Sequence, residues 1–445
     1  MLATRSIVKL GMQQPMRLSR CETEREVLQA VQLQKLRAML AEVLSRNAFY
    51  RRKLGSCEFP RSLEELTNLP FTTKQELLAD QQTAPPYGTN LTYPLARYVR
   101  LHQTSGSTAQ PLRWLDTPES WQWILQCWQR IFAIVGLRAN DRLFFPFSFG
   151  PFLGFWGAWD AASRGGWFVL PGGGMNTVAR VRAILDHGIS VVFCTPTYAL
   201  HLLEVARREG IDLTGSAVRM LIVAGEPGGS WPHVRQRIEQ GWEARVFDHT
   251  GMTEIGPLGI ECPENPLGVH LLETECIPEV IDPETGCRVL PGVEGELVLT
   301  NLGRWGSPLI RYRTGDRVVA DPEPCPCGRI WLRLKGGILG RQDDLVTVRG
   351  AKIYPAALDD VLRKFPEVGE YRVTVSAHGE LTELLLEIEP AELTGMEFPE
   401  KRHHLAERIS KEVQATFLVK PKIAIVPVGS LPRHELKARR WRKQI

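Results

Sequence analysis

The stretch from residue 121 to 224 alternates between helix-like segments and short apolar runs, and this alternation constrains the fold most. Apolar side chains recur at helical spacing over residues 121–135, 178–187 and 198–208. Two apolar four-residue runs, 191–194 and 221–224, have the length of buried strands. Such alternation is typical of an α/β domain with a largely parallel sheet. We therefore expect functional groups on the loops that leave the carboxyl ends of the strands.

The segments on either side of this core differ from it in character. Residues 22–47 predict a long amphipathic helix, and the hydroxyls of Thr72 and Thr73 predict the start of a second one. We assign this helical lead-in to residues 20–80. From about residue 277 to 335, strand-like runs joined by Pro/Gly turns predict a β-rich subdomain.

The last hundred residues predict a compact unit of their own. Strand-like and helix-like runs alternate from residue 345 to 426, which indicates an α+β domain of common size. A glycine cluster at 336–340 precedes the charged residues 341–344 and predicts a hinge at about 336–343. The expected fold class is therefore α/β, with a large N-terminal domain over 1–339 and a small mobile C-terminal domain over 340–445.

Composition excludes several classes of protein. A chain of 445 residues is too long for one core, and 43% apolar with 23% charged residues is ordinary for a globular protein. A net charge of +4 argues against a nucleic-acid partner. Nine irregularly spaced cysteines favour a reducing compartment, and we expect no signal peptide and no membrane insertion. A cytoplasmic monomer or homodimer is the expectation.

One short loop has the composition of an anion-binding site. Hydroxyl and glycine residues alternate in this loop, which consists of Thr104, Ser105, Gly106, Ser107 and Thr108. Backbone amides and O–H groups in such a loop can turn toward a single polyphosphate. The loop is not a Walker A motif, and a Ser/Thr-rich surface turn is the alternative interpretation.

Four cysteine and histidine side chains have the ligand types of a closed zinc site. Cys325 and Cys327 form a C-x-C turn, and Cys262 and His270 flank a Pro/Gly-rich loop. Three thiolates and one imidazole suit tetrahedral structural zinc. The spacing is unlike that of a zinc finger, and buried thiols otherwise act as small apolar groups. Cys276 and Cys287 are alternative ligands.

Several motifs occur in an order that resembles a known superfamily. They are residues 104–111, Gly225-Glu226-Pro227, residues 248–254, 295–297, 311–316, 340–344, and Lys437. The chain looks like a member of the adenylate-forming superfamily, which includes acyl-CoA synthetases, carrier-protein adenylation domains and luciferases. Residues 50–52 and 69–74, together with the short length, make the phenylacetate-CoA ligase-like branch the most similar one.

The resemblance implies an AMP-forming acid–thiol ligase. A carboxylic acid would be activated by ATP to an acyl-adenylate, with release of pyrophosphate, and then transferred to the thiol of CoA. One alternative is an adenylating enzyme that delivers the acyl group to a carrier protein or an amine. A minor alternative is a non-catalytic, zinc-stapled binding protein.

The resemblance also implies roles for individual residues. The loop from Thr104 to Thr108 would hold the β- and γ-phosphates, Thr253 would bond the α-phosphate, and Glu254 would hold Mg²⁺. Lys437 would bridge the substrate carboxylate and the α-phosphate as charge builds there. Asp316 would accept the ribose hydroxyls with Arg341 nearby. The residues expected to line adenine are Gly225, Glu226, Pro227, Asp248, His249 and Thr250.

The acid and CoA sites are implied in the same way. Phe147, Phe149 and Phe152 occupy the segment that walls the acid pocket in this superfamily, and aromatic walls favour an aryl or arylalkyl acid. Gly350 and Tyr354 belong to a loop that resembles the lining of the thiol tunnel. Three departures from the family pattern stand out, namely Ala109-Gln110 for Gly-Lys, Thr250 for an aromatic residue, and Leu436 for a glycine.

Overall fold

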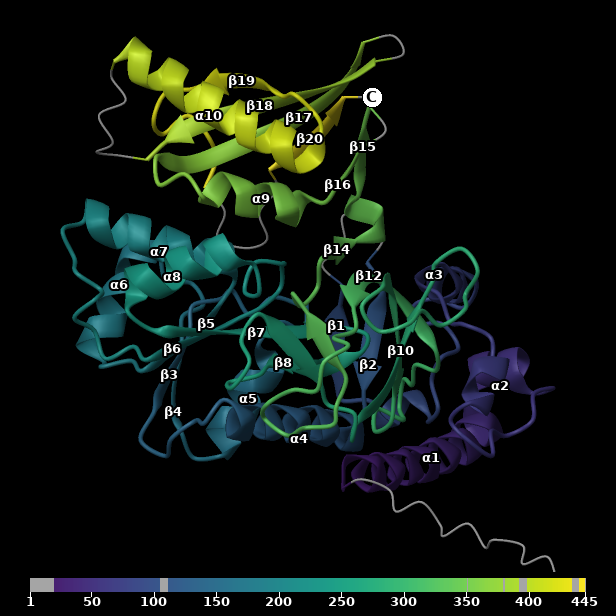
Figure 1. Ribbon diagram of the computed structural model, residues 1–445. Helices are drawn as coiled ribbons and strands as arrows, with labels where there is room; N and C mark the ends of the chain where they lie inside the picture. Colours follow the sequence, from purple (N-terminus) through teal and green to yellow (C-terminus); the bar gives the residue numbers. More distant parts are fainter. Residues whose placement is uncertain are drawn as a thin grey trace, which may run out of the picture.

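An eight-stranded sheet forms the centre of the molecule in the computed structural model, which describes residues 20–104, 111–349, 351–378, 381–391, 398–433 and 440–444 (Figure 1). The strand order is β13-β9-β8-β7-β6-β5-β3-β4. Neighbouring strands from β3 to β7 run parallel, as the alternation predicts, and β8, β9 and β13 extend the sheet with antiparallel pairs. The strands are β3 (Arg142–Phe145), β4 (Phe168–Pro171), β5 (Val191–Cys194), β6 (Met220–Val223), β7 (Arg245–Met252), β8 (Gly256–Glu261), β9 (Gly268–Leu271) and β13 (Arg333–Lys335).

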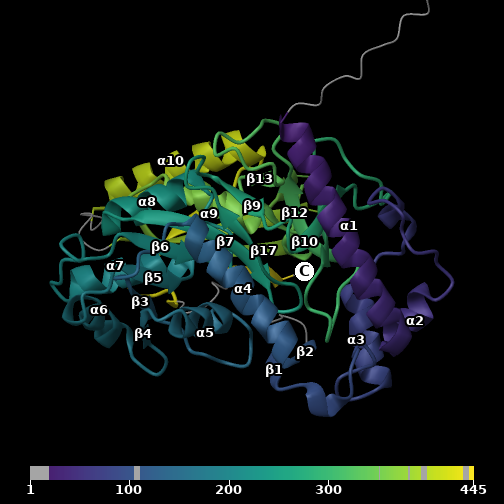
Figure 2. The same cartoon turned by 90° about the horizontal axis from the view of Figure 1, so that it is seen from below.

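Helices cover both faces of the parallel strands because successive side chains point to opposite faces. Phe193 and Ile222 face the core beneath α4 and α5, whereas Val192 and Leu221 face the core beneath α6, α7 and α8. Figure 2 shows α4 crossing the sheet on one side. The helices are α4 (Pro118–Ile134), α5 (Trp156–Arg164), α6 (Thr177–Asp186), α7 (Pro196–Arg208) and α8 (Pro232–Trp242).

The helical lead-in packs along one side of this body. Thr73 caps the second predicted helix in a capping box with Glu76. In the first helix, Leu28 and Gln32 face the body. Two apolar residues of the predicted amphipathic helix, Val27 and Val31, are exposed instead. The elements are α1 (Arg20–Arg46), α2 (Ala48–Leu54), α3 (Lys74–Thr83) and the short 3-10 helices η1 (Glu65–Asn68) and η2 (Leu95–Arg97).

A second sheet has the order β10-β11-β12-β14 and lies beside the first. Its extent differs from the predicted β-rich subdomain of residues 277–335. β13 pairs with β9 of the large sheet instead, because Arg333 donates to the carbonyls of Asn265 and Pro266 there. β14, from the predicted hinge, completes the small sheet. The strands are β10 (Cys276–Ile281), β11 (Glu294–Asn301), β12 (Tyr312–Val319) and β14 (Gly340–Arg341), and a separate hairpin consists of β1 (Arg100–Gln103) and β2 (Arg113–Asp116).

The C-terminal unit has its own sheet and its own core, and it lies over α7 and α8 (Figure 1). Its four-stranded sheet has the order β19-β18-β17-β20. β20 is an additional strand that runs parallel to β17 and uses the basic tail of the sequence. The elements are η3 (Gln342–Asp344), β15 (Val346–Val348), β16 (Ala351–Ile353), α9 (Pro355–Arg363), β17 (Val368–His378), β18 (Leu381–Pro390), α10 (Pro399–Phe417), β19 (Lys422–Ile425) and β20 (Trp441–Gln444).

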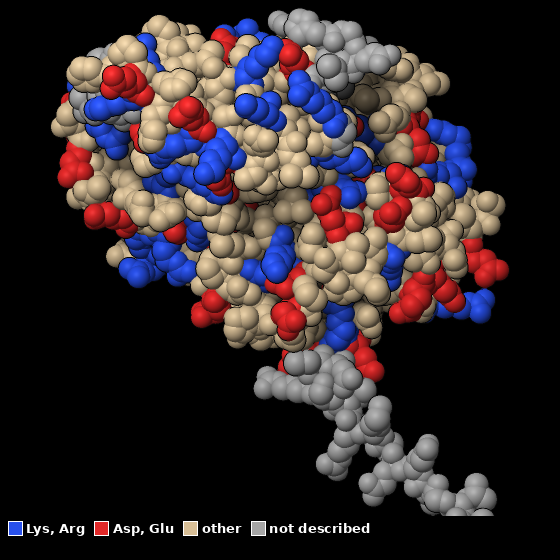
Figure 3. Space-filling view, turned by 45° about the horizontal axis from the view of Figure 1, so that its top comes forward, with Lys and Arg blue, Asp and Glu red and all other residues tan. Residues whose placement is uncertain are grey.

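Charge is mixed over the face of the molecule that carries the C-terminal unit. Figure 3 shows basic side chains interspersed with acidic ones there, without a continuous basic face. Among the described residues, no helix has the length and apolarity needed to cross a membrane.

Candidate active site

Three predicted site segments that are far apart in the sequence meet at the base of the β1–β2 hairpin. Thr104 closes this hairpin, because its Oγ1 accepts a hydrogen bond from the Leu112 amide at 3.0 Å. Next to it, the Gln103 amide donates to the Pro151 carbonyl at 2.6 Å. The Leu153 amide in turn donates to Thr253 Oγ1 at 3.4 Å. Ser105, Gly106, Ser107 and Thr108 lie outside the described residues.

A buried arginine fixes the turn that carries Thr253 and Glu254. Arg304 donates from Nε and Nη2 to the two carboxylate oxygens of Asp116, at 2.6 Å each. Its Nη1 donates to the Thr253 carbonyl at 2.6 Å. Burial alone would raise the pKa of Asp116, but Arg304 and His102 hold that pKa below its usual value. Because Asp116 ends β2, this ion pair joins the β1–β2 hairpin to the Thr253 turn.

Glu254, Asp316 and Arg341 form a charged group beside this turn. Glu254 is buried and accepts a hydrogen bond from the Tyr312 hydroxyl at 3.0 Å. Asp316 on β12 is the register partner of Arg341 on β14. Burial would lower the pKa of Arg341, but the neighbouring Asp316 and Glu254 raise it. The cluster therefore combines a carboxylate that could hold a cation with a fixed positive charge.

The predicted adenine-lining residues lie at the carboxyl ends of β6 and β7, where α/β sheets bind ligands. Gly225 has a φ of +93°, which a side chain would disfavour, and leads into Glu226 and Pro227. Glu226 Oε1 accepts a hydrogen bond from the Thr197 amide at 2.8 Å. Asp248 accepts from Ser230 Oγ at 2.7 Å, and burial raises the pKa of Asp248 to about 6.

His249 faces the other side of β7. Its ring centroid lies 4.4 Å from that of Trp128 on α4, and its Nδ1 lies 2.6 Å from the Gly259 carbonyl. Burial lowers the pKa of His249 to about 4, so the neutral ring donates its Nδ1 proton to that carbonyl. Thr250 is half-buried and pairs with Gly259 across the strands. The His249 side chain is therefore directed toward the α4 core and away from the side of β7 where Asp248 contacts Ser230.

The three predicted pocket phenylalanines form one cluster. The Phe147 ring lies 4.5 Å from Phe149 and 5.5 Å from Phe152, between centroids. Phe147 is buried, and the other two rings are half-buried. Gly154 is required between them, because a Cβ there would lie 2.6 Å from the Phe147 ring. The hydrogen bonds at Pro151 and Leu153 place this cluster next to Thr104 and Thr253.

Tyr354 of the C-terminal unit contacts the sheet formed by β10, β11, β12 and β14. Its ring packs on Gly340, where a Cβ would come within 2.6 Å of the ring, and its hydroxyl donates to Glu294 Oε1 at 3.0 Å. Tyr354 therefore rests on the predicted hinge. Lys437 and Gly350 lie outside the described residues.

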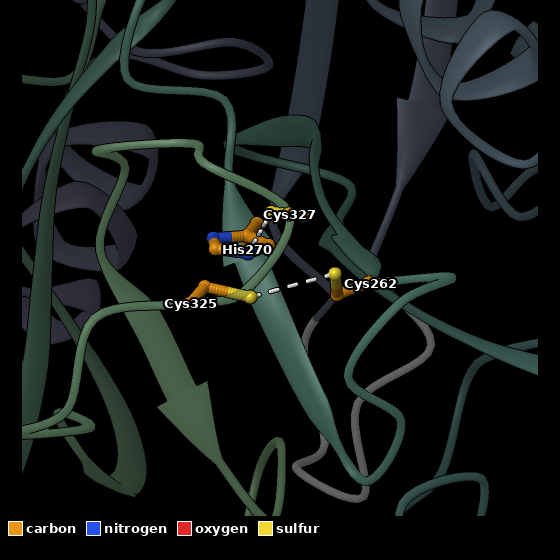
Figure 4. A group of neighbouring side chains, drawn as sticks. All are labelled: Cys262, His270, Cys325 and Cys327. Atoms are coloured by element: carbon orange, nitrogen blue, oxygen red, sulfur yellow. Dashed lines mark hydrogen bonds between the residues drawn. The ribbon is translucent and has the colours of Figure 1, made fainter.

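The cysteine and histidine residues of the predicted zinc site converge (Figure 4). Cys262 follows β8, His270 lies on β9, and the loop before β13 brings Cys325 and Cys327. Cys262 Sγ lies 3.6 Å from Cys325 Sγ, Cys327 Sγ lies 3.5 Å from His270 Nε2, and all four ligand atoms lie within 4.8 Å of one another.

These spacings fit a tetrahedral ion. Zinc with Zn–S bonds of about 2.3 Å separates two sulfurs by roughly 3.8 Å. His270 Nδ1 lies 3.2 Å from the Trp331 carbonyl, so a proton on Nδ1 leaves the Nε2 lone pair directed at the thiols. Cys276 lies in the apolar core and Cys287 is exposed, and neither belongs to this group.

Reasoning from the sequence missed Arg304 and Asp116. They are 188 residues apart, and each stands alone in its local sequence. The one feature of the sequence that could have indicated this ion pair is the position of Arg304 in a glycine- and tryptophan-rich stretch. A charged residue in such a stretch is expected to need a buried partner.

Two family models match this chain. The family model described as "AMP-binding enzyme" matches residues 94–303, and the model described as "AMP-binding enzyme C-terminal domain" matches residues 350–443. The phenylacetate-coenzyme A ligase of Thermus thermophilus is 32% identical, over 92% of this chain and 95% of its own.

Two solved structures of 2-hydroxyisobutyryl-CoA ligase are similar over 95% of this chain and 90% of theirs, at 30% identity. The TM-score is 0.88 for the postadenylation state and 0.69 for the thioesterification state. The difference indicates that the two domains of this chain are arranged as in the former. Because similarity to the ligases extends over nearly the whole chain, this protein belongs to the phenylacetate-coenzyme A ligase family of AMP-binding enzymes.

Proposed function

We propose that the chain is an ATP-dependent acid:CoA ligase that works through an acyl-adenylate. The observation that carries the proposal is the convergence of three groups at the carboxyl edge of the sheet. These groups are the Thr104 hairpin, the Thr253–Glu254 turn and the phenylalanine cluster, which hydrogen bonds through Pro151 and Leu153 hold together. An anionic nucleotide and an apolar acid would meet where these groups adjoin.

The first step needs neutralised charge and alignment, and it needs no base. The substrate carboxylate oxygen attacks the α-phosphorus of ATP, and the bond from this phosphorus to the bridging oxygen breaks to release pyrophosphate. Two anions must approach each other, so positioned cations and donors lower the barrier. In the second step the CoA sulfur attacks the acyl carbon, and AMP leaves.

The residues of the turn suit this chemistry. Thr253 Oγ1 accepts from Leu153, so its own proton is available to donate to an α-phosphate oxygen. Glu254 would hold Mg²⁺, which would supply charge neutralisation at the phosphates when bound. Asp316 would accept the ribose hydroxyls, with Arg341 opposite it. Lys437 would bridge the carboxylate and the α-phosphate.

An aromatic or arylalkyl acid is the proposed substrate class. Phe149 and Phe152 are only half-buried, so ring surface remains to pack against a planar ligand. The similar enzymes are named for phenylacetate and for 2-hydroxyisobutyrate, and the three rings favour the aryl class for this chain.

The experiment is pyrophosphate release across a panel of acids, with and without CoA. The panel contains phenylacetate, benzoate, 2-hydroxyisobutyrate and acetate. We expect fastest turnover with an aryl acid, and turnover that depends on CoA. Strong release without dependence on CoA would favour a carrier protein or an amine as acceptor. No release with any acid would favour the non-catalytic binding protein.

We also propose that Cys262, His270, Cys325 and Cys327 hold structural zinc. The ion would clamp the loop before β13 to β8 and β9, behind the nucleotide side of the sheet. A cytoplasmic, reducing compartment would keep these thiols available as ligands. Metal analysis of chelator-washed protein should give about one zinc per chain, and Cys325→Ser should lose the metal and lower the melting temperature. Less than about one-half zinc per chain would contradict the site.

A further inference from the structure

Two arginines flank the part of the sequence that contains Lys437. Arg433 precedes this lysine by four residues and Arg440 follows it by three. Residues 434–439 lie outside the described part of the chain, whereas both arginines lie within it. Each guanidinium group contacts the same helix of the large domain, α7.

Arg433 joins the C-terminal sheet to the middle of α7. Its Nη2 donates to Glu204 Oε1 at 2.8 Å and to Glu389 Oε1 at 2.6 Å, and its Nε donates to Glu204 Oε1 at 3.1 Å. Glu389 is fully buried and also accepts from the amides of Gly429 and Leu431 at 2.9 and 2.8 Å. The chain that leads into residue 433 is therefore fixed on its own domain, and Glu204 is the contact outside it.

Arg440 makes the corresponding contact at the start of α7. It donates to both carboxylate oxygens of Glu370 on β17, at 2.5 and 3.0 Å, and from Nη1 to Thr197 Oγ1 at 3.3 Å. The same Thr197 donates its backbone N–H to Glu226 on the nucleotide side at 2.8 Å. One residue of α7 therefore connects Arg440 to the predicted adenine loop.

Thr197 and Glu204 are two helical turns apart and share one face of α7. Arg433 thus pairs with Glu389 within the C-terminal unit and with Glu204 on α7. Arg440 pairs within the unit with Glu370 and, at 3.9 Å, with Asp359, and it contacts Thr197 on α7. If the unit moved away, Glu389 and Glu370 would keep both arginines paired, so no buried charge would be left unpaired. Contacts of this kind can be released at low cost.

We propose that Arg433 and Arg440 are positioning residues for adenylation, which dock the C-terminal unit on Thr197 and Glu204 of α7. The docked arrangement is the one shared with the postadenylation structures. It places against the large domain the two arginines that precede and follow Lys437 in the sequence. This inference rests on the proposed two-step function. The α7 contacts belong to the first half-reaction and are released before the second.

The test changes α7 and leaves the C-terminal unit intact. Glu204→Gln removes the charge that faces Arg433, and Thr197→Val removes the hydroxyl but keeps the N–H that Glu226 accepts. Glu209→Gln is the matched control, because Glu209 pairs only loosely with Arg208, at 3.9 Å, near the end of the same helix. Acyl-adenylate formation is measured without CoA, and thioester formation is measured from preformed acyl-adenylate plus CoA.

We expect Glu204→Gln to slow adenylation about 2- to 5-fold, Thr197→Val to slow it less, and neither to slow thioester formation. The proposal would be overturned if Glu204→Gln slowed both half-reactions to the same degree. It would also be overturned if Glu204→Gln adenylated as fast as the control Glu209→Gln.

Backbone hydrogen exchange supplies a second readout that does not depend on turnover. Glu204→Gln should raise exchange in residues 427–433, and Glu209→Gln should not. If the unchanged protein adenylates no acid, the proposed function fails, and exchange alone then decides the docking claim. Unchanged exchange in Glu204→Gln would overturn it.

Discussion

The two halves of the proposed active site are held by different kinds of contact. In the large domain, Arg304 and Asp116 are fully buried and join the β1–β2 hairpin to the Thr253 turn. Between the domains, the side chains of Arg433 and Glu204 remain 24% and 33% exposed. A second contact between the domains joins His233, whose side chain is 35% exposed, to the buried Asp360 at 2.9 Å.

We call the large-domain part, which Arg304 and Asp116 hold, the fixed half of the site. The exchangeable half is the C-terminal unit, which docks on α7. Removing one partner of a buried ion pair costs about 3–5 kcal/mol, whereas an exposed pair contributes about 0–1 kcal/mol. Breaking the contacts of the large-domain half therefore costs more than releasing the docking contacts. The docking surface can separate and re-form, as a two-step reaction that reuses one site requires.

The largest expected effect is on the exchangeable half. Lys437→Ala should lower the rate of adenylation by about 10²- to 10³-fold, because a cation that bridges two anions in the transition state is lost. Transfer from preformed acyl-adenylate to CoA should continue. The measurement is the rate of each half-reaction, with Lys422→Ala as control, since Lys422 is an exposed lysine of the same unit that pairs with Glu383. Equal loss in both half-reactions would contradict the role of Lys437.

The next effect is in the fixed half. Glu254→Gln removes the carboxylate proposed to hold Mg²⁺ but keeps an acceptor for the Tyr312 hydroxyl. We expect a fall in adenylation of about 10²-fold and a higher requirement for Mg²⁺. Adenylation is titrated against Mg²⁺ for this variant and for Glu58→Gln, a change at an exposed glutamate. An unchanged Mg²⁺ dependence would rule out the metal role.

Stability sharpens the comparison. Arg304→Met leaves Asp116 buried without its main partner and should cost about 3–5 kcal/mol of unfolding free energy. Arg61→Met, at an exposed arginine, and Glu204→Gln should each cost about 1 kcal/mol or less. Denaturant unfolding measures all three. Similar costs for Arg304→Met and Glu204→Gln would remove the distinction between the two halves.

The smallest effect is a pH dependence. The folded-state pKa of His249 is lowered to about 4 by burial, so between pH 6.5 and 4 the unfolded chain binds a proton that the folded chain does not. The stability from the neutral ring is present above pH 6.5 and is lost as the pH falls. The melting temperature of each protein is measured at pH 7.5 and at pH 5. Its fall between these two pH values should be about 2–4 °C smaller for His249→Gln than for the unchanged protein. An identical pH profile would place the ring in solvent.

Some parts of the fold and of the site could be predicted from local sequence patterns, and other parts could not be. The parallel strands were predictable because apolar runs and helical spacing repeat along the chain. The four members of the cysteine–histidine cluster were predictable from residue type. β20 was not, because a short polar strand is defined by its partner β17. Two further features depend on contacts between distant segments, which no local pattern records. One is the pairing of β13 with the large sheet and of β14 with the small sheet, and the other is the ion pair of Arg304 with Asp116.

A single-turnover reaction tests the central claim most directly. Enzyme in excess over an aryl acid is mixed with Mg-ATP, and CoA is added after a delay. The account predicts one pyrophosphate per acid consumed before CoA is added, an enzyme-bound acyl-adenylate, and conversion to acyl-CoA and AMP afterwards. Release of ADP and phosphate, or formation of acyl-CoA with no pyrophosphate before CoA is added, would contradict it.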